Sequence, residues 1–264
     1  GLVGSEMCIR DSEYFAPIVT MQFNNLQPPF DNILVRKAVA HAINREMVVR
    51  NVWFGLGKVA TGPVSSKSKY YTGDVDKYPY DPKKAEELLE QAGFKKDASG
   101  VRLRIVYEIS PLGAEYLRLG EVLKQQLARV GIQIELRTQD SASSTRRLYY
   151  EYDFKFFTAY IGTYADPQLA VYWSKNIVKG VPFSNASRYS NPDMDRLLEA
   201  VQVENDPGKR MEQFYQIQKI AARDLPILPL FELEQLTVFD KRVQDHTMTF
   251  DGPFSNLAHV WIAK

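Results

Sequence analysis

The stretch that decides the fold class begins with VRLRIVYEI (Val101–Ile109) and ends with IQIELRT (Ile132–Thr138). Both segments are rich in β-branched and aromatic residues, which is typical of strands. The residues between them, Ala114–Val130, predict a helix that ends at Gly131. A strand, a helix of that length and a second strand form a βαβ unit, so the two strands should be parallel, with a right-handed crossover.

The flanking segments add strands and capped helices to this unit. IVTMQFN (Ile18–Asn24) alternates apolar and polar residues like a half-buried strand, and the next helix should place Arg36 and Lys37 opposite its apolar face. Asp81 and Pro82 predict a helix start. The other expected elements are a helix capped by Asn44, a loop at 65–79, a strand at 153–161, helices at 191–201 and 207–223, and an extended segment at 225–239. The class is therefore α/β with a mixed sheet.

Composition excludes several classes of protein. The 264 residues carry 33 Lys and Arg against 32 Asp and Glu, a net charge of +1, so no long-range field indicates a nucleic-acid or membrane-surface partner. The apolar runs are far shorter than the roughly 20 residues that span a bilayer. We therefore expect a globular chain that meets a membrane only through another protein or through a missing N-terminal anchor.

The first twelve residues hold the one cysteine of the chain, Cys8. The segment LVGSEMCIRDS (Leu2–Ser12) resembles an in-frame translation of a sequencing-library adapter, and it lacks the apolar core of a signal peptide. We therefore expect residues 1–12 to be an artefact and the biological sequence to start near Glu13. A cysteine-free remainder suits an oxidising compartment.

Few residues indicate chemistry. His41, His246 and His259 lie far apart without metal-binding spacing, and we expect neither a metal site nor a cofactor. GLGKVATG lacks the pattern of a phosphate-binding loop and predicts a flexible turn. Acidic residues near expected strand ends are too common to indicate a glycosidase. Aromatic residues crowd one region, where they either line a cleft or fill the core: Tyr149, Tyr150, Tyr152, Phe154, Phe156, Phe157, Tyr160, Tyr164, Tyr172 and Trp173.

Six segments together resemble one family. In chain order they are PPFDNILVRKAVAHAINRE (28–46), GLGKVATGPV (55–64), YPYDPKKAEELLEQAGF (78–94), GIQIEL (131–136), YADP (164–167) and LPILPLF (225–231). This order is similar to that of the family 5 extracytoplasmic solute-binding proteins, the dipeptide, oligopeptide, nickel and related receptors of ABC importers. The resemblance implies the mixed-sheet lobe of a two-lobed periplasmic-binding-protein clamshell, type II and cluster C like, that closes on its ligand.

The resemblance also implies a division of the chain. Residues 13–232 would form the second, C-terminal ligand-binding lobe, and residues 233–264 would return to a first lobe encoded upstream. Without that lobe the apolar residues of the returning segment should be poorly buried: Val243, Met248, Phe250, Val260 and Trp261. A signal sequence would lie upstream, so the expected location is periplasmic or extracytoplasmic.

The expected site follows from the same resemblance. Peptide-binding members carry a W-x-A-D-Y-x-D/E-P pattern whose first Asp pairs with the ligand's ammonium group. In this chain Thr163 stands at that position and Asp166 at the later acid, so the ammonium anchor is missing. The residues expected to line the cleft are Tyr160, Gly162, Thr163 and Tyr164. Asp166 should cap the turn before Pro167, and Arg118 is a candidate partner for a ligand carboxylate. Trp173 and Trp53 are candidate stacking surfaces.

These residues lead to one expected function and two alternatives. The chain should capture a peptide, modified peptide or sugar-like solute and deliver it to ABC permease subunits, without catalysis, because ligand contacts stabilise a closed shape that the transporter recognises. The first alternative is the ligand-sensing domain of a transcription regulator. The second is a glycoside hydrolase, for which no catalytic constellation is evident.

Overall fold

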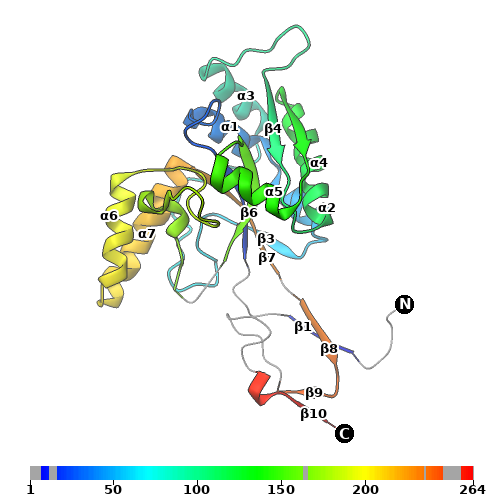
Figure 1. Ribbon diagram of the computed structural model, residues 1–264, viewed down its shortest axis with the longest axis vertical. Helices are drawn as coiled ribbons and strands as arrows, with labels where there is room; N and C mark the ends of the chain where they lie inside the picture. The colour runs from blue at the N-terminus through cyan, green and yellow to red at the C-terminus, as the bar shows by residue number, and fades with distance from the viewer. Residues whose placement is uncertain (1–6, 12–16, 163–165, 235, 246–256, 264) are drawn as a thin grey trace.

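The computed structural model of the chain describes residues 7–11, 17–162, 166–234, 236–245 and 257–263. Its main body is one six-stranded sheet in the order β3-β7-β2-β6-β4-β5, with helices packed around it (Figure 1). The strands are β2 (Ile18–Phe23), β3 (Gly57–Val59), β4 (Leu103–Glu108), β5 (Ile132–Arg137), β6 (Phe156–Ile161) and β7 (Ile227–Leu233). The predicted α/β class with a mixed sheet is confirmed.

The predicted βαβ unit is present. β4 and β5 are parallel in register from Leu103 opposite Ile132, and the helix between them is α4 (Ala114–Ala128). β6 also runs parallel to β4 but overlaps only its last two residues, so β6 continues beyond the end of β4. This stagger extends the end of β6 toward the lower part of Figure 1.

The predicted helices form where their caps indicate. Asn44 accepts from the Met47 amide at the start of α2 (Arg45–Val52), and Asp81 accepts from the Lys84 amide at the start of α3 (Pro82–Gln91). The other helices are α1 (Ile33–Ala42), α5 (Ser141–Thr145), α6 (Pro192–Val203) and α7 (Pro207–Asp224). A π-helical turn (Arg146–Glu151) extends α5, and single 3₁₀ turns lie at Ala170–Tyr172, Ser174–Asn176 and Leu257–His259.

Three expectations about local structure are wrong. β2 is buried along its whole length rather than on one face, because it lies in the middle of the sheet between β6 and β7. Arg36 is buried rather than facing solvent, since its guanidinium donates to the carbonyls of Phe30, Asp224 and Leu225. Part of GLGKVATG is not a flexible turn, because residues 57–59 form β3 and pair with β7.

Two small sheets lie apart from the main body, at the bottom of Figure 1. β1 (Met7–Asp11) pairs with β8 (Leu236–Asp240), and β9 (Val243–Gln244) pairs with β10 (Trp261–Ile262), both antiparallel. In this part Trp261 is 53% exposed and Val243 and Val260 are half-buried, whereas Met248 and Phe250 lie outside the described residues. The division of the chain at residue 232 stays a prediction.

Candidate ligand-binding site

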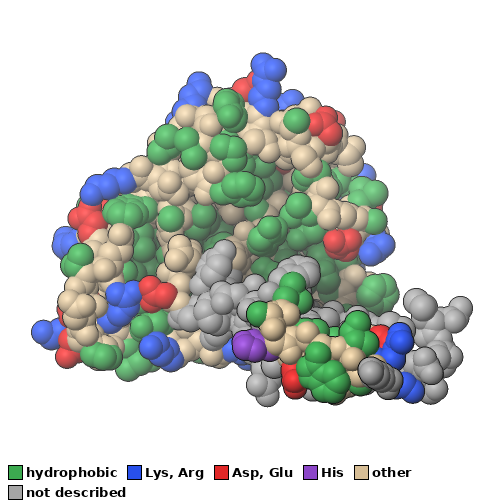
Figure 2. Space-filling view, turned by 60° about the horizontal axis from the view of Figure 1, so that its bottom comes forward, with side chains coloured by type: hydrophobic (Ala, Val, Ile, Leu, Met, Phe, Trp, Pro, Cys, Tyr) green, Lys and Arg blue, Asp and Glu red, His purple; other side chains and the backbone are tan. Residues whose placement is uncertain are grey.

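The candidate site lies at the end of the sheet where β6 and β7 leave it. Ile18, the first residue of β2, pairs with Ile161 on one side and with Glu232 on the other. Gly162 and Leu233 therefore lie at the same end of the sheet. In Figure 1 this end of β6 and β7 points toward the small sheets. Figure 2 shows this end of the molecule, where hydrophobic side chains gather toward the hollowed centre of the face.

Tyr160 is the predicted site residue that lies within β6. Its side chain is 51% exposed, although its backbone lies within the sheet opposite Val19. Because side chains alternate along a strand, Tyr160 lies on the same face as Thr158, whose hydroxyl is hydrogen-bonded to Tyr107 in the core. A large aromatic ring left open to solvent at a sheet end is available for a ligand to stack on.

Tyr116 of α4 and Trp53 lie on this side of the sheet. Burial, and then the neighbouring charges of Glu115 and Tyr160, raise the pKa of Tyr116 to about 12. Trp53 packs edge-on against Tyr116 at 5.9 Å and against Phe231 at 4.5 Å between ring centroids. Trp53 is therefore at least partly a core residue, and Tyr116 stays neutral across the physiological pH range.

Gly162 lines a shallow depression beside the end of β6. The rest of its lining is Pro63, Val64, Ser65, Ser68, Pro167 and Gln168. The segment that carries Ser65 forms one wall of the depression, and Pro167 and Gln168 form the other. Glycine at this position leaves the backbone accessible, which is what a ligand that bonds to main-chain atoms requires.

Glu232 of β7 holds the Ser65 wall in place. Its carboxylate, on a residue only 7% exposed, accepts hydrogen bonds from the Ser65 hydroxyl at 3.1 Å, the Ser66 amide at 3.1 Å and the Ser66 hydroxyl at 3.0 Å. A buried carboxylate is stable only when it is satisfied in this way. From the sequence Glu232 is one of several acids near expected strand ends, and nothing local indicates its role in holding the Ser65 segment.

The structure places the other predicted site residues in separate surroundings. Asp166 forms an ion pair with Arg210 of α7 at 2.6 Å. Trp173 is half-buried in a second hydrophobic cluster, with Lys175 5.4 Å from its ring. Arg118 is exposed on α4, with no hydrogen bond to any described residue. Thr163 and Tyr164 lie outside the described residues. Of this set, Tyr160 and Gly162 are the pair that the end of β6 brings together.

Most of the aromatic residues of the crowded region are core residues. Tyr149, Phe154, Phe156, Phe157 and Tyr172 are all buried. Tyr152 and Trp173 are half-buried, and Tyr150 and Tyr160 are exposed, at 47% and 51%. The aromatic density therefore reflects packing in most positions, and Tyr160 is the ring at the sheet end.

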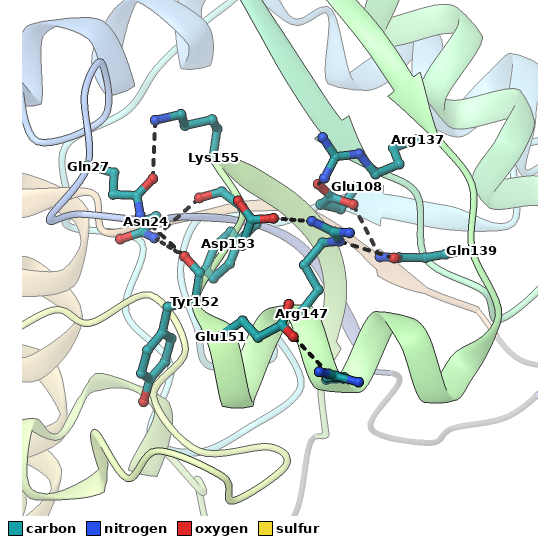
Figure 3. A network of polar contacts seen from close by, with 12 residues as sticks. Asn24, Gln27, Glu108, Arg137, Gln139, Arg147, Glu151, Tyr152, Asp153 and Lys155 are labelled. Carbon is teal, nitrogen blue, oxygen red and sulfur yellow. Dashed lines mark hydrogen bonds and ion pairs between the residues drawn. The ribbon is translucent and has the colours of Figure 1, made fainter.

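A polar network supports the segment that leads into β6 (Figure 3). Tyr152 adopts a left-handed conformation, with φ of 54°, and the Asn24 side-chain amide donates to the carbonyls of Tyr152 and Phe154 at 3.2 Å each. Lys155 donates to Gln27 at 3.1 Å. These bonds fix the turn from which β6 starts, and so they fix the direction of the strand that carries Tyr160.

The second half of this network surrounds the buried carboxylate of Glu108 at the end of β4 (Figure 3). Arg137 lies 3.1 Å from it, and Gln139 donates to its other oxygen at 3.1 Å while accepting from Arg147. Burial raises the pKa of Glu108, and Arg137 and Arg147 oppose that shift. The arrangement joins β4, β5 and the π-helical turn and leaves no reactive group facing a cleft.

The described part of the chain holds no candidate metal site and no candidate membrane span. No three His, Cys, Asp or Glu side chains there lie close enough together to hold a metal ion. No described helix is both long and apolar enough to cross a membrane.

Known proteins show strong similarity to this chain. It is 26% identical over 239 residues to a di/tripeptide-binding protein of Pseudomonas aeruginosa, and 25% identical over 208 residues to the dipeptide-binding protein of Escherichia coli. The alignments cover 89% and 79% of this chain but 43% and 39% of those proteins. The chain thus spans under half the length of these relatives.

Solved structures share the fold. The oligopeptide-binding protein AppA from Bacillus subtilis, in complex with a nonapeptide, matches 98% of this chain with a TM-score of 0.85 and 22% identity, over 53% of its own length. NikZ from Campylobacter jejuni, in complex with Ni(L-His), matches 92% with a TM-score of 0.82 and 20% identity, over 50% of its length. At such identities the likeness establishes the fold alone.

The family model described as the middle part of the bacterial extracellular solute-binding proteins, family 5, matches residues 13–179. This range includes the βαβ unit and β6. By this match the chain belongs to the family 5 bacterial extracellular solute-binding proteins.

Proposed function

We propose that the chain is the ligand-binding lobe of an extracytoplasmic receptor that captures a peptide-like solute and delivers it to the permease of an ABC importer. The observation that supports this most is the family match over residues 13–179, which contain the exposed Tyr160 and the open backbone at Gly162. The relatives named above bind peptides, and none of them is a transcription regulator or a glycosidase.

The mechanism is binding followed by a change of shape. A solute that contacts this lobe and a facing lobe stabilises the closed arrangement by its differential affinity for that arrangement. We propose that residues 13–232 form this lobe and that the segment after Leu233, where β7 ends, crosses to the facing lobe. Sequencing the locus upstream of codon 13 tests this division, because it predicts several hundred further codons and a signal sequence. An in-frame stop codon just upstream of codon 13 would contradict it.

The residue at position 163 suggests which peptides bind. A hydroxyl at the place of the ammonium-binding carboxylate cannot balance a buried positive charge. We therefore propose that this receptor accepts solutes without a free α-ammonium group, such as amino-blocked peptides, as readily as free ones.

Calorimetric titration of the full-length receptor with paired peptides tests this proposal. Ala-Ala, Ala-Phe and Ala-Ala-Ala would each be compared with the N-acetylated form. The proposal predicts that the two affinities of each pair differ by about threefold or less, because no carboxylate at position 163 favours the free ammonium group. A threefold difference is well under the 1.4 kcal/mol that corresponds to about tenfold. A preference above tenfold for the free peptides would contradict the amino-blocked ligand class. Absence of binding by every peptide would contradict the peptide-receptor function itself.

A further inference from the structure

One buried carboxylate ties a wall of the candidate site to the sheet. Glu232, the last residue but one of β7, is 7% exposed and accepts hydrogen bonds from Ser65 and Ser66. Ser65 is 2% exposed and lines the depression beside Gly162, whereas Glu232 does not line it. The carboxylate therefore lies behind the wall, and it can affect a solute only through the two serines.

The Ser65 hydroxyl is engaged on both sides. It donates to Glu232 at 3.1 Å, and it accepts from the Lys67 amide at 3.3 Å. A hydroxyl has one proton to donate, so Ser65 has none left for a solute. The contribution of Ser65 to the site is therefore the position of the wall rather than a hydrogen bond to the ligand.

The segment that contains this wall is attached to other elements at both ends. The Ala60 amide donates to a carbonyl of β7 at 3.3 Å, and the Tyr70 carbonyl accepts from the Gln218 side chain of α7 at 2.8 Å. Between these anchors, Glu232 accepts from the Ser66 amide and from both serine hydroxyls. Loss of the carboxylate should therefore release the middle of the segment and leave its ends attached.

We propose that Glu232 is a positioning residue, which holds the segment 63–68 where the solute requires it. This inference rests on the proposed function, because it concerns the same site. When the wall also occupies displaced positions, the affinity falls in proportion to the fraction of molecules whose wall is in place. The position needs an acceptor rather than a negative charge, since a glutamine oxygen can accept the same hydrogen bonds.

Calorimetric titration of the full-length receptor with Ala-Phe and N-acetyl-Ala-Phe tests the proposal. Glu232→Ala should weaken binding of the tighter probe about tenfold, which corresponds to a wall in place in about one molecule in ten. Glu232→Gln should bind within about threefold of the parent. Ser66→Ala removes one hydrogen bond without leaving a buried charge unpaired, and it should weaken binding about threefold.

A matched control separates this role from general stability. Gln126 of α4 is 1% exposed, and its side-chain oxygen accepts from the Asn44 amide at 2.6 Å, but it does not line the depression. Gln126→Ala should lower the melting temperature and leave the affinity for both probes unchanged. Hydrogen exchange of the ligand-free receptor gives a second measurement, because Glu232→Ala should accelerate exchange over 63–68 and not in β4.

Three results would overturn the positioning role alone. The first is the parent affinity in both Glu232→Ala and Ser66→Ala, whatever their melting temperatures. The second is a loss in Glu232→Gln equal to that in Glu232→Ala, since the charge itself would then be what binding needs. The third is an unchanged exchange rate over 63–68 in ligand-free Glu232→Ala. A parent receptor that binds neither probe is a different result, which contradicts the proposed function and the positioning role together.

Discussion

The two halves of the six-stranded sheet differ in regularity. The half that contains β4, β5 and α4 is regular, and its interior is apolar: Tyr107, Leu119, Leu123, Leu127 and Ile132 belong to one continuous buried cluster. The half that follows β5 contains a π-helical turn, two 3₁₀ turns and non-glycine residues with positive φ at Tyr152, Phe183 and Arg188. This half has smaller buried clusters of its own, and its irregular segments are also fixed by individual polar bonds.

Asn185 shows how the irregular half is built. It is fully buried, and its side-chain amide donates to the carbonyls of Trp173 and Tyr189 while its oxygen accepts from the Ser187 hydroxyl. One side chain thus closes the segment between β6 and α6. A few specific contacts therefore position the candidate site on a scaffold that is stabilised mainly by buried apolar side chains.

Removal of apolar volume from the regular half should have the largest effect. Leu119→Ala should lower the free energy of unfolding by about 3 kcal/mol, because Leu119 is 0% exposed and a cavity would remain. Urea unfolding followed by circular dichroism measures this loss. Leu117→Ala on the same helix is the control, since Leu117 is 45% exposed and its loss should cost about 0.5 kcal/mol or less. Equal losses for both variants would show that α4 does not pack as described.

Removal of a polar anchor from the irregular half should have a smaller and more local effect. Asn185→Ala should cost about 2 kcal/mol, because two buried carbonyls lose their donor. Hydrogen exchange should accelerate between residues 173 and 189 and stay unchanged in α4. Uniform acceleration across both halves would mean that they unfold as one unit, and the distinction between them would fail.

A pH-dependent contribution from Glu108, where the halves meet, should be the smallest effect. Burial raises the pKa of Glu108, so the folded chain binds this proton more tightly than the unfolded chain. Its contribution to stability should therefore fall as pH rises from the unfolded value near 4.5 through the raised folded value. The stability difference between the parent chain and Glu108→Gln should decrease over that range in urea unfolding at stepped pH. A rising difference for Glu108→Gln would mean that Arg137 and Arg147 dominate.

The helices were predictable in both halves, because their caps are local. Caps such as Asn44 and Asp81 act on amides within a few residues, so local sequence determines them. Arg36 could not be placed, because the carbonyls of Asp224 and Leu225 that bury it lie 188 and 189 residues away along the chain. The bonds between Glu232 and Ser66 are hidden in the same way by a separation of 166 residues.

The candidate site stays a prediction. The family resemblance proposes Tyr160 and Gly162, and the structure places Tyr160 near the end of β6 and Gly162 directly after it. The sequence does not show which of the neighbouring aromatic residues are buried. Alternation along a strand assigns side chains to two faces, but it does not show which face the rest of the protein covers. The stagger of β6 past β4, which exposes Tyr160, is a property of the assembled sheet.

The measurement that tests the account most directly is peptide affinity of the full-length receptor with Tyr160 or Tyr150 changed to alanine. Both rings are about half exposed in the irregular half, but Tyr160 alone of the two lies at the sheet end beside Gly162. The account predicts that Tyr160→Ala weakens binding of the tightest peptide about tenfold or more by calorimetry, while Tyr150→Ala changes it less than twofold. Unchanged affinity in Tyr160→Ala, with both variants folded, would contradict the placement of the ligand at this end of the sheet.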